Sequence, residues 1–111
     1  MTTQIKSKLV KVDWLKDCET GHSNGYVGVP VGHPWYKVDY DAIACDIHGG
    51  LTFAQHDEPT GKPPEQDNTD ESYWWVGFDV CHFGDNPKNW NLQRCRLELD
   101  SLIEQARKAT K

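Results

Sequence analysis

Four of the five histidines stand within two residues of a glycine or a proline, where a turn can present the imidazole to a ligand or a metal. They are His22, His33, His48 and His82, in the stretches GHSNG, GHP, DIHGG and CHFGD. Glycine allows close backbone approach, and binding residues are often held on turns by a rigid sheet. Two stretches, CDIHGG (45–50) and FDVCHFGD (78–85), each combine a thiol, a carboxylate and an imidazole, and we expect them to meet in the fold.

One chemistry open to these residues is metal binding. Asp46, His48, Asp79 and His82 supply two imidazoles and two carboxylates, a set that suits zinc, iron or manganese. Asp46 and His48 share a face if their segment is a strand, and Asp79 and His82 come together if the chain turns at Cys81. A zinc centre with an open position would activate water, so a metal-dependent hydrolase is one hypothesis. The sequence contains no HExxH motif.

Thiol chemistry is less favoured. A zinc site that uses Cys18 and Cys45 has acceptable spacing, but alternation in a strand would put Cys45 and His48 on opposite faces. Cys81 and His82 are adjacent, and neighbouring side chains in a strand point apart, so they do not predict a nucleophile and its base. The sequence leaves open whether the protein is an enzyme.

A second chemistry is the binding of a small ligand without metal. Aromatic rings can stack on a flat ligand, histidines and carboxylates can form directed hydrogen bonds, and amides of consecutive glycines can approach a phosphate. The predicted ligand-binding residues are His33, Trp35, Tyr36, His48, Gly49, Gly50, Trp75, Asp79 and His82. The competing interpretation is that the tryptophans form the core, and for the adjacent Trp74 and Trp75 we expect one in each role.

The segment 41–55, DAIACDIHGGLTFAQ, is predicted to be the hairpin that positions His48. Gly49 and Gly50 suit the two positive-φ positions of a type I′ turn. Alternation along the strand would then turn the aliphatic residues toward the core and leave Asp46 and His48 on the other face. This hairpin would hold both side chains in solvent or in a shallow polar pocket.

Three other segments have strand patterns, over 8–15, 24–31 and 73–80. Pro30 cannot donate to a ladder, so the second strand should end there or lie at an edge of the sheet. The third strand carries large apolar groups on both faces, which suits a central position.

The last segment, 91–110, is predicted to be a helix because its apolar residues recur with a period of about 3.6, with Asn91 as the cap. Two loops complete the chain. The aromatic segment 32–41 suits a contact surface, and 56–72, rich in prolines and carboxylates, is predicted to be a mobile acidic loop.

These elements predict an α+β fold, with a small antiparallel sheet of about four or five strands packed against one long C-terminal helix. A chain of 111 residues is the size of one ordinary domain, so we expect a single domain over 1–111. Five of the residues are tryptophan, and the core should rely on such large rings because the mean hydropathy is only −0.74.

Charge and hydropathy exclude several classes of partner. The net charge is −5 and no basic patch is present, which disfavours nucleic acid as a partner. No apolar segment approaches the roughly 20 residues that span a membrane, and the first residues do not resemble a signal peptide. We therefore expect a cytoplasmic protein with reduced thiols and no membrane partner.

The blocks GYVGVPVGHPWYKVDYD, CDIHGGLTFAQ and WWVGFDVCHFGD, followed by RLELDSLIEQ, resemble a family of small uncharacterised proteins encoded by tailed bacteriophages and prophages. The resemblance covers residues 24–106, and its HGGLT and WWxGFDxxH blocks are specific. It implies a phage accessory protein in the host cytoplasm, in which the blocks around His33, His48, Asp79 and His82 belong together. It implies no particular activity.

The sequence thus supports three functional hypotheses. The leading one is a phage-type accessory protein that binds a small anionic or nucleotide-like ligand in a pocket of histidine, aspartate and aromatic residues, and so counters a host defence. The second is the metal-dependent hydrolase. The third is an inhibitor of a host protein, in which Trp35 and Tyr36 anchor the interface.

Overall fold

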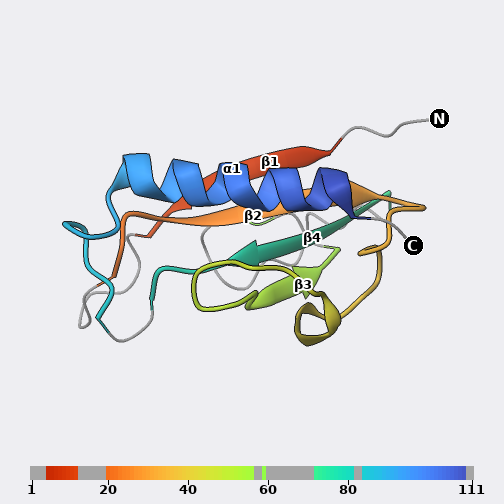
Figure 1. Cartoon of the computed structure of the whole chain (residues 1–111), viewed down its shortest axis with the longest axis horizontal. Helices are drawn as coiled ribbons and strands as arrows, with labels where there is room; N and C mark the ends of the chain where they lie inside the picture. Colours follow the sequence, from red (N-terminus) through yellow and green to blue (C-terminus); the bar gives the residue numbers. More distant parts are fainter. Residues whose placement is uncertain (1–4, 13–19, 57–58, 60–71, 82–83, 110–111) are drawn as a thin grey trace.

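The fold is a four-stranded antiparallel sheet with one long helix lying along one of its faces (Figure 1). The computed structural model describes residues 5–12, 20–56, 59, 72–81 and 84–109. Its elements are β1 (Lys6–Lys11), β2 (Ser23–Pro30), the 3-10 helix η1 (Tyr40–Ala42), β3 (Phe53–Gln55), β4 (Tyr73–Phe78) and α1 (Leu92–Lys108). The predicted α+β layout is confirmed, with four strands among the described residues.

The strands lie in the order β1-β2-β4-β3, so β2 and β4 form the centre of the sheet. In their register Tyr26 faces Gly77 and Gly25 faces Phe78, so each ring lies over a glycine of the neighbouring strand. A Cβ added at Gly77 would lie only 2.6 Å from the carbonyl oxygen of Gly25. Glycine at these positions therefore lets two large rings pack across the central pair of strands.

The helix α1 begins and packs as its sequence pattern predicts. The Asn91 side chain accepts a hydrogen bond of 2.9 Å from the backbone N–H of Arg94, which caps the first turn. One stripe of the helix is buried against the sheet, and it consists of Cys95, Leu99, Leu102 and Ala106. Leu97 lies outside this stripe and is 62% exposed.

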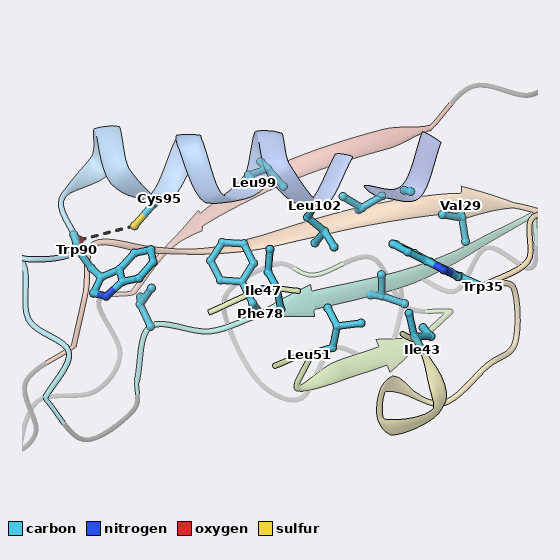
Figure 2. Close-up of a cluster of buried hydrophobic side chains, with 14 residues drawn as sticks. Val29, Trp35, Ile43, Ile47, Leu51, Phe78, Trp90, Cys95, Leu99 and Leu102 are labelled. Carbon is cyan, nitrogen blue, oxygen red and sulfur yellow. Dashed lines mark hydrogen bonds between the residues drawn. The ribbon is translucent and has the colours of Figure 1, made fainter. Parts of the chain in front are cut away.

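The main core fills the layer between α1 and the sheet (Figure 2). Val27, Val29, Val76 and Phe78 of the two central strands are completely buried there. Two tryptophans close the layer, Trp90 near the first turn of α1 and Trp35 near its last turn (Figure 2); their neighbours from the loops include Ile43, Ile47 and Leu51. The helix, the sheet and the segment 43–51 therefore share one core.

The opposite face of the sheet carries a second cluster, formed by Val10, Tyr26, Tyr73 and Trp75 with Phe53 against it. Pro59 is also fully buried, and its carbonyl oxygen accepts a hydrogen bond from Lys8 Nζ. His56 Nδ1 donates to Tyr73 O over 2.8 Å. The segment predicted as a mobile acidic loop is therefore anchored at His56 and Pro59, while 57–58 and 60–71 lie outside the described residues.

The hairpin predicted over 41–55 is wrong. The turn hydrogen bond joins Ile47 O to Gly50 N over 2.9 Å, so its central residues are His48 and Gly49 and not the two glycines. The residues before the turn form no strand, and β3 pairs with β4, with Phe53 opposite Gly77. The physical reason is that 46–48 lies beside α1, where the side chains of Gln105 and Glu98 bind the backbone of Asp46 and His48.

Other predicted elements are shifted in extent. The second strand ends at Pro30, as predicted, and Val31 beyond it is 64% exposed. The first strand is Lys6–Lys11, whereas its predicted range of 8–15 runs into residues outside those described. The strand predicted over 73–80 is β4, and its central position is confirmed because it lies between β2 and β3. No helix in the described part of the chain is long and apolar enough to cross a membrane.

Candidate functional site

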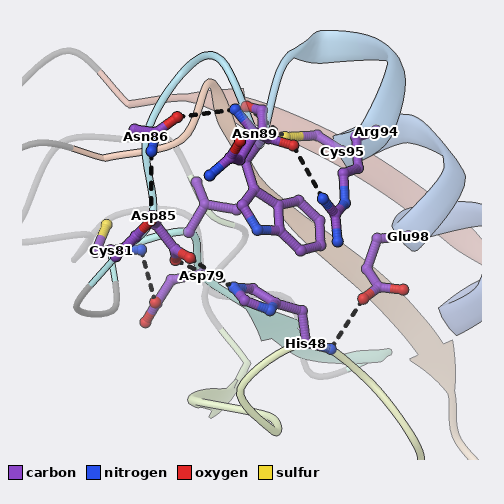
Figure 3. Close-up of polar contacts among 12 residues, drawn as sticks. His48, Asp79, Cys81, Asp85, Asn86, Asn89, Arg94, Cys95 and Glu98 are labelled. Carbon is purple, nitrogen blue, oxygen red and sulfur yellow. Dashed lines mark hydrogen bonds and ion pairs between the residues drawn. The ribbon is translucent and has the colours of Figure 1, made fainter.

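A groove with a volume of about 520 Å³ lies between the N-terminal half of α1 and the segment 46–48. Its lining comes from three parts of the chain and consists of Asp46, Ile47, His48, Trp90, Arg94, Leu97, Glu98 and Ser101. Figure 3 shows the polar contacts at one end of this groove, where His48 meets Asp85 and the first turns of α1. We call it the His48 groove.

The segment 46–48 is held to α1 by helix side chains that bind its backbone. Gln105 Oε1 accepts from Asp46 N, and Gln105 Nε2 donates to Asp46 O, both over 2.7 Å. One Glu98 oxygen accepts from His48 N over 3.0 Å. Two long polar side chains thus take the place that a neighbouring strand would have in a sheet, and they fix one wall of the groove relative to the other.

His48 is oriented by a buried carboxylate. Its Nε2 donates to both oxygens of Asp85, at 3.0 and 3.1 Å. The His48 side chain is 23% exposed and that of Asp85 only 6%, so the pair lies at the boundary between the groove and the interior. The bond fixes the proton on Nε2 of the imidazole.

Asp85 is positioned by a rigid turn. Gly84 before it has a φ of +93°, which favours glycine. The Asn86 side chain after it accepts from the backbone N–H groups of Lys88 and Asn89, at 3.0 and 2.8 Å, and so forms a local turn. The turn delivers Asp85 to His48 from a segment 37 residues away in the chain.

Trp90 forms the base of the groove. The His48 ring centroid lies 4.0 Å from that of Trp90, and the Arg94 guanidinium carbon lies 4.2 Å from it. Its backbone is tied down as well, because Trp90 N donates to Asn86 O and Trp90 O accepts from His22 N, both over 2.8 Å. Trp90 is only 6% exposed, so it acts as a support for His48 and Arg94 and offers little ring surface of its own.

Two of the thiols near the site, those of Cys45 and Cys95, are poor nucleophiles at neutral pH. Burial raises the pKa of the Cys45 thiol, and the neighbouring Asp46 carboxylate raises it further. Burial also raises the pKa of the Cys95 thiol, which lies in the core beneath Trp90 and contacts Trp90 O over 3.6 Å. Both groups therefore stay protonated, and neither supports thiolate chemistry.

The expected meeting of the CDIHGG and FDVCHFGD stretches is confirmed by the bond between His48 and Asp85. Of the predicted ligand-binding residues that the structure describes, only His48 lines the groove. The Gly50 amide is occupied by Ile47 O within the turn, so it does not offer the phosphate contact predicted for it. Asp79 uses one oxygen to accept from Cys81 N over 3.1 Å, and His82 lies outside the described residues.

The predicted site residues of the GHPW loop do not reach the groove. His33 binds the far end of α1, where its Nε2 donates a hydrogen bond of 2.7 Å to Ala106 O. Its Nδ1 accepts a hydrogen bond from Trp35 N. Trp35 is 6% exposed and belongs to the core, so it cannot serve as an interface anchor. Tyr36 contacts the His56 ring instead, with centroids 5.6 Å apart.

Trp75 is also placed away from the groove. It is 3% exposed and lies in the cluster on the opposite face of the sheet, because alternation in β4 turns it away from α1. Trp74, its neighbour, packs against the main core and donates from Nε1 to Val38 O over 3.0 Å. Both tryptophans of this pair are structural.

The predicted metal set is not assembled among the residues described. No group of three or more His, Cys, Asp or Glu side chains within that part of the chain is arranged to hold an ion. His48 uses Nε2 for Asp85, and His22 binds the Ser23 hydroxyl over 2.6 Å. His82 and Cys18, which complete the two proposed ligand sets, fall outside the described ranges.

Sequence reasoning missed most of the groove. Arg94, Leu97, Glu98 and Ser101 recur at helical spacing, and this stripe lies next to the buried one, so the helix pattern contained a usable signal. Asp85 ends the FDVCHFGD stretch, but no local pattern in the sequence pairs it with His48. No family model, curated protein or solved structure matches the chain.

Proposed function

We propose that this chain is a phage-type accessory protein that binds a small ligand with an anionic group in the His48 groove. The observation that carries the proposal is the Arg94 guanidinium, which is held at the groove over Trp90 and beside His48. The ligand would enter between the segment 46–48 and α1, and its anionic group would meet Arg94.

Arg94 is suited to this role because its position is fixed while its donors are largely unused. Its contact with Trp90 is a cation–π arrangement, and one of its terminal nitrogens donates to Asn89 O over 3.2 Å. A guanidinium has five N–H donors in a planar fork that matches a carboxylate or phosphate. The remaining donors support a bidentate, charge-assisted contact with such a group.

The size and lining of the groove support a small molecule. Its volume of about 520 Å³ falls within the usual range for small-molecule sites, roughly 300–1,000 Å³. Because Trp90 is only 6% exposed, a nucleobase would find little indole surface on which to stack. The charged group of the ligand, and not an aromatic ring, is therefore the feature on which recognition would depend.

The resemblance to phage-encoded proteins supports a role in the infected host. A protein that holds a small charged metabolite or signal removes it from solution, which is a direct way to counter a host defence. Binding alone is enough for this role, and no nucleophile is required.

The proposal is tested by titrating isotopically labelled protein with inorganic phosphate, acetate and a nucleoside monophosphate while recording its amide and indole NMR signals. We expect shifts at His48, Trp90 and Arg94, and we expect Arg94→Gln to weaken binding about tenfold, because a charge-assisted hydrogen bond is lost. Arg107→Gln is the matched control, since Arg107 lies in the last turn of α1 outside the groove. Equal loss in both variants, or no shifts at the groove, would contradict the proposal.

A further inference from the structure

We infer that the ligand of the His48 groove is a zwitterion, a small molecule with a carboxylate or similar anion at one end and an amino group at the other. The inference rests on the proposed function and names the class of ligand. It follows from the way the groove displays charges of both signs that do not neutralise one another.

Arg94 and Glu98 are one helical turn apart on α1, at a spacing where opposite charges commonly pair. They form no ion pair here. Arg94 is drawn to Trp90 and Asn89, whereas Glu98 is drawn to the backbone N–H of His48. Contacts with the rest of the protein thus draw the two charges toward different partners, and neither neutralises the other.

The groove lining contains a second carboxylate besides Glu98, that of Asp46. Asp46 is exposed, and its backbone is bound by Gln105 while its side chain has no hydrogen bond or ion pair to any described residue. Glu98 keeps one oxygen beyond the one that His48 N occupies. These two carboxylates in the groove lining favour an ammonium group, and they would weaken the binding of a ligand that carries only negative charge.

The groove lining also offers apolar surface to a short hydrocarbon link between the two charges. Leu97 lies between Arg94 and Glu98 in the sequence, lines the groove and is 62% exposed. Side chains one helical turn apart have Cβ atoms about 6 Å apart, and the charged groups of Arg94 and Glu98 extend from there toward different partners. A chain of a few methylene groups would cover Leu97 while its ends meet Arg94 and Glu98.

The experiment compares two series of probes of equal length by the same NMR titration. The first is β-alanine, γ-aminobutyrate and ε-aminocaproate, and the second is propionate, butyrate and caproate. We expect at least one amino acid to bind about fivefold more tightly than the matching carboxylate, the scale of one partly exposed ion pair. The best chain length should be an intermediate one.

The charge variants decide which group is responsible. Glu98→Gln keeps an oxygen that can accept from His48 N, and it should remove most of the difference between the two series by weakening the binding of the amino acids. Glu104→Gln is the matched control, because Glu104 pairs with Lys108 over 3.5 Å on the outer face of α1.

The outcomes separate this inference from the proposal on which it rests. If the amino acids and the carboxylates bind the groove with equal affinity, and Glu98→Gln changes neither affinity, the zwitterion inference is overturned. The binding of an anionic group then stands. If neither series binds, both are overturned. A difference that disappears in Glu98→Gln and persists in Glu104→Gln supports the inference.

Discussion

At the scale of single residues, the bond between His48 and Asp85 is the contact on which the geometry of the groove depends. It joins the groove wall to the turn that precedes α1, and one partner is almost fully buried. His48 is therefore both a groove residue and a structural one. His48→Ala would leave the Asp85 carboxylate without this partner, so it would change stability as well as binding.

Asp85 offers a direct test of this contact. We expect Asp85→Ala to lower the free energy of unfolding by roughly 1–3 kcal/mol, the cost of leaving a buried hydrogen-bonding group without its partner. Asp85→Asn should cost less, because the amide oxygen can still accept from His48 Nε2. Urea denaturation of both variants measures the difference, and an Asp85→Ala variant as stable as the wild type would show that the bond contributes nothing.

Cys95 predicts a pH dependence of stability. Burial raises the pKa of its thiol in the folded protein above the unfolded value. The resulting stabilisation is complete below the unfolded pKa of about 8.5 and is lost as the pH rises through the folded pKa. Urea denaturation at a series of pH values should therefore show a steeper alkaline loss for the wild type than for Cys95→Ala. Parallel curves for the two proteins would refute this prediction.

At the scale of elements, α1 has two roles, and each belongs to a different stripe of its side chains. One stripe builds the core, and the neighbouring stripe lines the groove and binds the backbone of 46–48. The helix, its cap and its buried stripe could be predicted because they depend on residues three or four apart. The position of 46–48 could not, because its partners Gln105 and Glu98 lie 50 or more residues away and leave no local pattern.

The cap of α1 can be tested independently of the core. Asn91→Ala removes the side-chain acceptor for Arg94 N, and we expect a loss of about 1 kcal/mol in the free energy of unfolding. Asn91→Asp should restore most of it, since aspartate is an equally good cap. Thermal and urea denaturation compare the three proteins, and a loss of equal size in the Asp variant would show that the cap is not the cause.

At the scale of the whole molecule, the two ends of the core layer differ in whether they border an open groove. Trp90 at one end supports an open groove, whereas Trp35 at the other is sealed by His33 and the last turn of α1 (Figure 2). The sequence predicted the fold class and the burial pattern of β4, because alternation and helical period report which faces are apolar. The sequence could not show that Trp35 belongs to the core and that Trp90 lies at the groove, because each stands in a polar loop with similar neighbouring residue types.

The measurement that tests the central claim most directly is the native mass of the protein purified from cells, compared with its denatured mass. We predict an excess that matches one bound small molecule in the wild type and in Arg107→Gln, and its loss in Arg94→Gln. An excess of equal size in Arg94→Gln would contradict the claim that the ligand is held at the His48 groove. So would a wild type that carries no excess as purified and gains none after incubation with the amino acid and carboxylate probes.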